Sequence, residues 1–280
     1  MVCDDSETIS VFKYHEVTVT EQLTVEGLQS PHDIASCKLN RCLYIVDGKS
    51  NCVWKISDTQ LKPTTSKRIT PQKVMIISKP YVFTVAKDGN ILKIQQQNHV
   101  QIHSPEGNLI LSFQIPIPSN VETMQIVQKA NGNFLSSYKK LTHSQTGRAW
   151  NWYVSEFDEG GTSVMNSGAQ AGHLRDSRYL AVITEGDDDL FVITADCDNS
   201  TVLMLDDNLK LCKHNILLNN QHDDILYPNR IIYIAKTKEL IVGQHNGLIK
   251  VYKVDVMSHK TYGRQDSNVL HKMERVNHRF

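Results

Sequence analysis

Apolar and polar residues alternate along most of this chain, in short runs that are separated by polar turns. In LYIVDGKSNCVWKI, residues 43–56, two alternating runs flank one such turn. Because successive side chains of a β-strand point to opposite faces, this pattern predicts two half-buried strands joined as a hairpin. No segment shows the apolar period of a long amphipathic helix. The sequence therefore predicts an all-β protein.

The same strand pattern returns at nearly regular intervals. The equivalent positions are Ile9, Val53, Val100, Trp152, Val202 and Ile249. Their separations are 44, 47, 52, 50 and 47 residues. A period of about 40 to 50 residues in an all-strand sequence is typical of the four-stranded blades of a β-propeller. Asp88-Gly89 and Asn131-Gly132 each join two of these strands, as expected of tight hairpin turns.

Composition agrees with a globular protein. The chain has 280 residues, of which 40% are hydrophobic and 21% are charged, and its 30 basic residues balance its 30 acidic ones. We find no leader peptide and no apolar run long enough to cross a membrane, so the expected location is the cytoplasm. There are six cysteines. Cys37 and Cys42 could face each other, although buried reduced thiols are favoured.

Three segments carry a resemblance to a known family. They are SPHDIASCKLNRCLYIVDGKSNCVWKI (residues 30–56), RYLAVITEGDDDLFVITADCDNSTVLMLDDNLKL (178–211) and YPNRIIYIAKTKELIVGQHNGLIKVYKV (227–254). They resemble the NHL-repeat propeller, similar to the C-terminal domain of many tripartite-motif (TRIM-NHL) proteins. That repeat has an Asp after its second strand and an Asn before its third, matched here by Asp47 with Asn51 and by Asp196 with Asn199. We expect these pairs to brace the turn through side-chain to backbone hydrogen bonds.

The resemblance implies a six-bladed propeller over residues 1–255. Only five of the six units have all their inner strands, because the unit at Ile9 begins almost at the N-terminus. We therefore predict an incomplete first blade, and a five-bladed ring closed by an N-terminal strand is the alternative. Residues 256–280 are polar and weakly patterned, which predicts a flexible C-terminal tail.

The resemblance also implies recognition of a substrate or of RNA for ubiquitin ligases. The sequence contains no CxxC pair and no Cys/His zinc spacing, so neither a RING nor a B-box domain is present in it. The expected function is that of a non-catalytic scaffold, a recognition module without a cofactor. RNA binding is an alternative, although it requires a concentrated basic surface, and here the sequence pI is about 7.2.

A metal-dependent, lactonase-like propeller is the enzymatic alternative. Related enzymes bind calcium or zinc near the starts of their inner strands, and Asp33, Glu122 and Asn229 occupy such positions here. Arg178 and Arg230 occupy others, and their charge opposes a cation. We therefore predict no metal site and no catalytic residues.

The candidate binding surface is one rim of the propeller, where the starts of the first strands and the turns before the third strands meet. The segment KKLTHSQTGRAW, residues 139–150, accounts for the longest separation and is predicted to be an extended contact loop. Trp150 and Trp152 alternate, and either could instead pack the blade. We expect a monomer that binds a protein partner here. The candidate rim residues are His32, Asp33, His143, Arg148, Trp150, Arg178, Asn229, Arg230 and His245.

Overall fold

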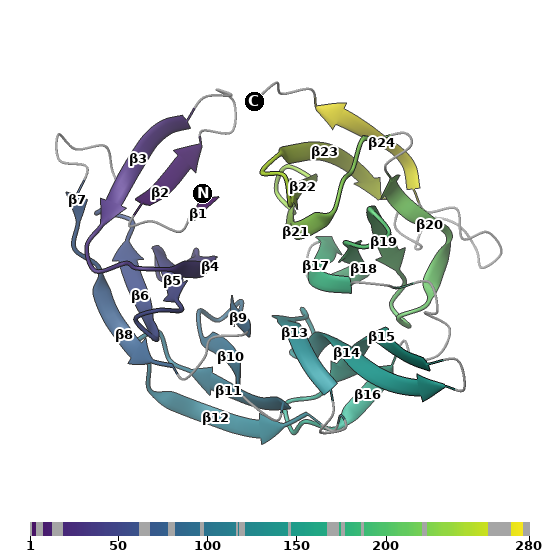
Figure 1. Cartoon of the computed structure of the whole chain (residues 1–280), viewed down its shortest axis with the longest axis horizontal. Coiled ribbons are helices and arrows are strands. Elements are labelled where there is room, and N and C mark those ends of the chain that lie inside the picture. Colours follow the sequence, from purple (N-terminus) through teal and green to yellow (C-terminus); the bar gives the residue numbers. More distant parts are fainter. Residues whose placement is uncertain are drawn as a thin grey trace. The chain divides into compact units, whose positions relative to one another are not determined.

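The structure is a computed structural model. It describes residues 2–3, 8–12, 19–61, 68–77, 82–95, 98–115, 117, 121–144, 147–166, 174, 177–185, 188–219, 223–256 and 270–276. The chain divides into two compact units, Met1–Gln114 and Ile115–Phe280. The strands are labelled in Figure 1.

The first unit holds three four-stranded sheets. The N-terminal sheet contains β1 (Val2–Cys3), β2 (Thr8–Phe12), β3 (Val19–Val25) and β7 (Arg68–Ile69). The next contains β4 (Pro31–Cys37), β5 (Cys42–Asp47), β6 (Cys52–Ser57) and β8 (Gln72–Ile76). The third contains β9 (Val82–Val85), β10 (Ile91–Gln95), β11 (His99–His103) and β12 (Leu109–Gln114).

The second unit also holds three four-stranded sheets. The first contains β13 (Val121–Gln128), β14 (Phe134–Ser144), β15 (Gly147–Phe157) and β16 (Ser163–Asn166). The second contains β17 (Ser177–Glu185), β18 (Asp188–Asp196), β19 (Thr201–Leu205) and β20 (Leu211–Asn219). The last contains β21 (Pro228–Ile234), β22 (Glu239–Gln244), β23 (Ile249–Val256) and β24 (Leu270–Val276).

Five of these sheets are regular antiparallel blades, in which each strand pairs with the next one of the same sheet. The prediction of an all-β propeller with four-stranded blades is confirmed. Five regular blades correspond to the alternative blade count. The N-terminal sheet, in which β3 pairs with β7 in parallel, lies where the incomplete first blade was expected.

Two expectations about the chain ends need correction. Among the described strands, no sheet combines strands from both ends of the chain, so the closing N-terminal strand of the five-bladed alternative is not found. Part of the predicted tail, residues 256–280, is ordered as strand β24, which pairs with β23 from Val251↔Val276 to Val256↔Leu270. In the sequence of β24, the Leu, Met and Val residues are separated by charged residues. An outer strand with this composition is difficult to distinguish from a polar tail by sequence.

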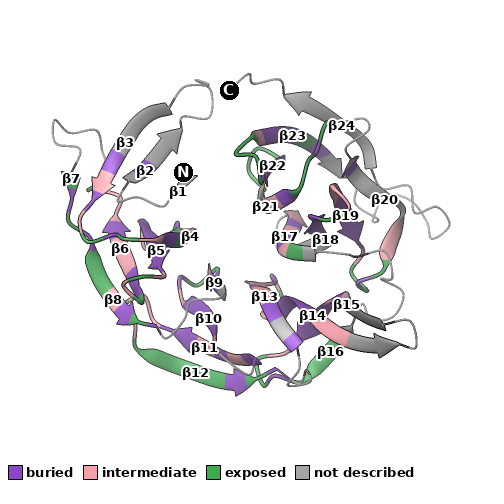
Figure 2. Ribbon diagram, in the orientation of Figure 1, coloured by how far each residue is buried: buried purple, intermediate pink, exposed green. Residues whose placement is uncertain are grey.

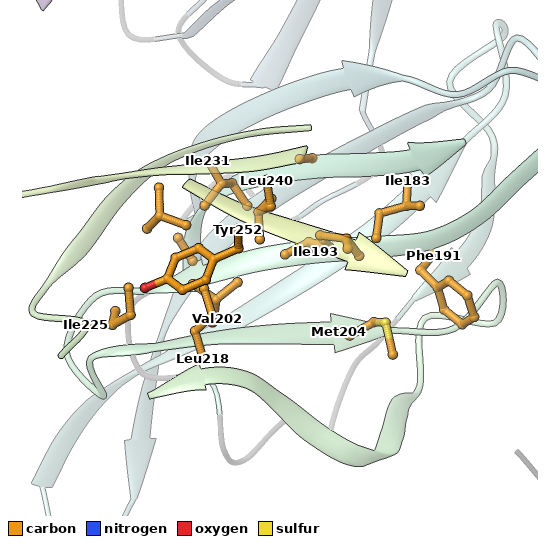
Figure 3. Packing of buried hydrophobic residues seen from close by; sticks show 14 residues of the cluster. Ile183, Phe191, Ile193, Val202, Met204, Leu218, Ile225, Ile231, Leu240 and Tyr252 are labelled. Atoms are coloured by element: carbon orange, nitrogen blue, oxygen red, sulfur yellow. The ribbon is translucent and has the colours of Figure 1, made fainter. Parts of the chain in front are cut away.

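The first strands of successive blades lie side by side within each unit. In the second unit, β17 contacts both β13 and β21, and in the first unit β4 contacts β9. The blades pack face to face through apolar clusters. One large cluster joins the last two sheets and includes Ile183, Ile193, Val202, Leu240 and Tyr252 (Figure 3). Each such side chain contributes about 1.5 to 3 kcal/mol when it is fully buried.

Cys37, Cys42, Cys52, Cys197 and Cys212 carry free thiols, and the first four of these are buried. Burial, together with the nearby carboxylates of Asp206 and Asp207, raises the pKa of the Cys212 thiol to about 11. Cys37 and Cys42 are direct cross-strand neighbours at the end of the β4–β5 hairpin. Thiols with these surroundings are core groups of the blade.

Candidate functional site

Three predicted rim residues occupy the same structural position. The first strand of a blade carries a β-bulge near its start in β4, β17 and β21. The extra residue is His32 in β4, Arg178 in β17 and Asn229 in β21. Met124 is the corresponding residue of β13. A bulge changes the direction in which a side chain points at the edge of a sheet. The strand starts that look alike in sequence therefore also share this local geometry.

In the blades of β4, β17 and β21, the second strand ends on a buried polar side chain opposite the bulge. In β5 this residue is Asp47, whose carboxylate accepts hydrogen bonds from the backbone N–H groups of Gln29 (2.8 Å), Ser30 (3.0 Å), Lys49 (3.1 Å) and Ser50 (3.2 Å). The carboxylate thus joins the segment before β4 to the turn after β5. The predicted bracing role of Asp47 is confirmed.

Electrostatics agree with that role. Burial alone would raise the pKa of the Asp47 carboxyl, but the backbone N–H groups of Gln29, Ser50 and Ser30 outweigh it and lower the pKa below its usual value. The equivalent residue of β18 is Asp196, which is also buried and accepts a hydrogen bond from the Asn199 side chain at 2.8 Å.

The last blade uses an amide at this position. Gln244, the final residue of β22, is buried, and its Oε1 accepts a hydrogen bond from the backbone N–H of Leu226 at 2.8 Å. The segment thereby held, Asp223–Tyr227, leads into β21. Its other end is held by Lys250, whose ammonium donates to the carbonyl oxygens of Asp223 (2.8 Å) and Asp224 (2.6 Å).

Two further hydrogen bonds fix Tyr227. Its backbone N–H donates to the Ser200 hydroxyl at 3.2 Å, and its carbonyl accepts from the backbone N–H of His245 at 3.1 Å. These partners lie in the turns before the third strands of the last two blades. The predicted rim residue His245 therefore positions Tyr227 through its backbone, while its own side chain is exposed.

Tyr227 has an unusual backbone conformation. Its φ is 46°, in the left-handed region, which few residues other than glycine, asparagine and aspartate adopt. It also precedes Pro228, and proline further restricts the residue before it. Strain of this kind costs on the order of 1 kcal/mol or more, persists only where surrounding contacts impose it, and is concentrated at functional sites.

The strained segment presents apolar side chains to solvent. Tyr227 is 54% exposed, and Leu226 and Leu248 are also exposed. Leu248 follows Gly247 in the β22–β23 turn, next to His245 and Asn246. We define Leu226, Tyr227, His245 and Leu248 as the rim patch of the second unit. An aromatic and two leucines on a rigid support form a surface suited to a protein contact.

Sequence analysis did not identify the apolar members of this patch. The strand starts at Pro31 and Pro228 look alike in sequence, yet the backbone before Pro228 is left-handed and that before Pro31 is not. The only local signal was an aromatic residue immediately before a strand-initiating proline.

In the second unit, the residue that follows each of these bulges is polar or aromatic. In β13 this residue is Gln125, whose side chain accepts a hydrogen bond from the backbone N–H of Leu180 in β17. In β21 it is Arg230, whose guanidinium lies 3.8 Å from the ring centroid of Tyr179, the equivalent residue of β17. Cation–π contact of this kind orders Arg230 and ties neighbouring blades together.

The predicted contact loop at residues 139–150 is wrong in form. β14 and β15 are both eleven residues long and continue through this segment as an antiparallel hairpin, with His143 paired to Arg148 and Leu141 to Trp150. The side chains of His143, Arg148 and Trp150 lie outside the described ones, so their contact role stays a prediction. Trp152 is buried and packs the blade, as one alternative had it.

His32 and Asp33 belong to the first unit, whereas the other predicted rim residues belong to the second. The His32 ring packs on Gly48, where an added Cβ would come within 2.6 Å of Nε2. Asp33 Oδ1 accepts a hydrogen bond from the backbone N–H of Ile34 at 2.9 Å. The predicted residues therefore fall into two groups, one in each unit.

In the part of the chain that the structure describes, no group of three or more His, Cys, Asp or Glu side chains is placed to hold a metal ion. The side chain of Glu122 lies outside that part. No helix among the described residues is long and apolar enough to cross a membrane.

Comparison with known proteins bears on the fold. No family model and no curated protein matches the sequence. Among solved structures, the chain is similar to Kuenenia stuttgartiensis hydrazine synthase, with 11% identity, 88% of this chain and 89% of that chain covered, and a TM-score of 0.59. It is similar to a functionally unknown protein from Desulfotomaculum acetoxidans, with 17% identity, 97% and 78% covered, and a TM-score of 0.54.

A third similar structure is a luciferin-regenerating enzyme, with 12% identity, 88% of this chain and 76% of that chain covered, and a TM-score of 0.57. Because all three identities are low, the likeness extends to the fold alone. The chain is a β-propeller protein.

Proposed function

We propose that this propeller is a non-catalytic scaffold that binds a protein partner through the rim patch of its second unit. The observation that carries the proposal is the exposed side chain of Tyr227 on a left-handed backbone, which donates a hydrogen bond to Ser200 and accepts one from His245. The resemblance of the sequence to TRIM-NHL propellers, which act in recognition, supports it.

An exposed tyrosine on an ordered loop is well suited to binding a protein partner. Tyrosine is enriched among the residues that dominate protein interfaces, because its large amphipathic ring has few rotatable bonds. A binding loop that is already ordered loses less conformational entropy when the partner docks. Here the backbone of Asp223–Tyr227 is fixed at both ends, by Lys250 and by His245.

Site-specific photo-cross-linking tests the proposal. A benzoylphenylalanine replaces Tyr227 in one variant and Leu39 in a control, because Leu39 is even more accessible but lies on a turn of the first unit. We expect a discrete protein adduct from position 227 in cells and none from position 39. The same adducts from both positions, or none from position 227, would contradict the proposal.

A purified partner then allows the patch to be mapped. Leu226→Ala and Leu248→Ala remove exposed apolar contacts without disturbing the hydrogen bonds that hold the loop. Each substitution is expected to weaken binding several-fold, and Tyr227→Ala by about 30-fold, the effect of a residue that contributes about 2 kcal/mol.

A further inference from the structure

The outer strand of the third sheet exposes an unusual row of apolar side chains. In β12, Leu109 is 55% exposed, Ile110 is 56% exposed, and Leu111 is also exposed. Figure 2 shows β12 as a largely exposed strand beside the similarly exposed β8. The turn before β12 lies against β8, because an added Cβ on Gly107 would come within 2.5 Å of the Val74 carbonyl oxygen. Ile76, at the end of β8, is 73% exposed and extends the apolar surface.

This edge lacks the usual protection. Proteins guard outer strands against pairing with other chains by placing charged residues on them or by keeping them short. β8 contains Lys73, β20 contains Lys213, and β24 contains a row of charged residues. β16 has only four residues. β12 has six residues, LILSFQ, and none of them is ionisable.

β12 is the outermost strand of its sheet. Among the described strands it pairs only with β11, and the pairing is interrupted at Ile110, where a bulge leaves one extra residue. The bulge turns Leu109 and Ile110 outward and confines a regular edge to Leu111–Gln114. A partner strand would therefore add main-chain hydrogen bonds along Leu111–Gln114 and apolar contacts at Leu109 and Ile110.

We propose that β12 pairs with β12 of a second copy of this chain, forming a two-fold symmetric dimer. Antiparallel pairing across a two-fold axis brings the same strand to both sides, so an edge strand that is apolar and neutral meets its own complement. No like charges are brought together, and the chain as a whole has a formal net charge of zero. This surface lies in the first unit, and the inference does not depend on the rim patch. It replaces the expectation of a monomer.

The test is the molar mass of the purified chain, measured by light scattering and by sedimentation equilibrium over a range of concentrations. The wild type is expected to be a dimer. Ile110→Lys replaces the apolar contact at each end of the paired edge by a charge and should raise the dissociation constant at least about tenfold. Val164→Lys is the matched control, because Val164 is similarly exposed on β16. It should leave the dimer intact.

Hydrogen exchange provides a second measurement on the unmodified chain. Amides of Leu111–Gln114 should exchange more slowly in concentrated than in dilute wild-type protein. A wild type that is monomeric at all concentrations would overturn the proposal, as would a dimer that Ile110→Lys does not weaken or that Val164→Lys weakens equally. Leu109→Glu replaces Ile110→Lys if the latter variant fails to fold, since Leu109 is exposed to the same degree.

Discussion

Replacement of Asp47 by alanine tests how the blade is braced. The carboxylate accepts four backbone hydrogen bonds, two from Gln29 and Ser30, and two from its own turn at Lys49 and Ser50. Water can replace the carboxylate at the turn, because Lys49 is exposed and Ser50 is half-buried. The net loss in Asp47→Ala is therefore the two hydrogen bonds that Gln29 and Ser30, in the segment before β4, donate to the carboxylate. At about 1.5 kcal/mol for a hydrogen bond to a charged group, Asp47→Ala should lower the free energy of unfolding by about 3 kcal/mol.

The assay is urea unfolding followed by circular dichroism, with Asp88→Ala as the control. Asp88 is exposed and accepts hydrogen bonds only from Asn90, so its removal should cost less than about 0.5 kcal/mol. Because folding lowers the pKa of Asp47, its stabilising effect is complete above the unfolded pKa, about 3.9, and is lost as the pH falls through the folded value. The difference between wild type and Asp47→Ala should therefore shrink below pH 4.

Asp47→Asn should recover part of the loss, since an amide oxygen can accept two of the four bonds. The bracing argument is refuted if Asp47→Ala unfolds within about 0.5 kcal/mol of the wild type at pH 7, the range of an ordinary surface substitution. It is also refuted if the difference between the two proteins does not change between pH 7 and pH 3.

Three further substitutions probe the blades, each by urea unfolding. Burial lowers the pKa of Lys93, so Lys93→Met should raise stability by about 1 kcal/mol at pH 7, and this advantage should disappear as the pH rises toward 10.5. Lys129→Met should cost about 3 kcal/mol, because it leaves the buried carboxylate of Glu156, 2.8 Å from the ammonium, without its cation; an effect below 1 kcal/mol would contradict this. Gly107→Ala should cost about 2 kcal/mol, since φ is +92° and Val74 blocks a Cβ, whereas an unstrained glycine site would gain stability.

Much of the fold could be predicted because its hydrophobic pattern is local. Alternating residues identified the second and third strands of each blade, and Asp88-Gly89 and Asn131-Gly132 identified two tight turns. Both glycines have positive φ, 84° and 90°. The bracing role of Asp47 was also predictable, since a polar residue that ends a buried strand must find hydrogen-bond partners.

The remaining features depend on contacts between distant segments. Residues 139–150 were interpreted as a loop, because beyond the blade both faces of a hairpin are polar and the alternation disappears. β7 was missed because it has only two residues and pairs in parallel with β3. The conformation of Tyr227 follows from hydrogen bonds with Ser200 and His245, which no local pattern encodes.

The rim patch can be tested most directly by changing one residue in a way that separates binding from folding. Tyr227→Gly removes the exposed ring and also relieves the left-handed backbone strain, so the variant should be at least as stable as the wild type. With the partner isolated by cross-linking, calorimetry should show an affinity at least about 30-fold weaker, while the thermal unfolding midpoint is unchanged or higher. An unchanged affinity for Tyr227→Gly would contradict the proposed rim patch.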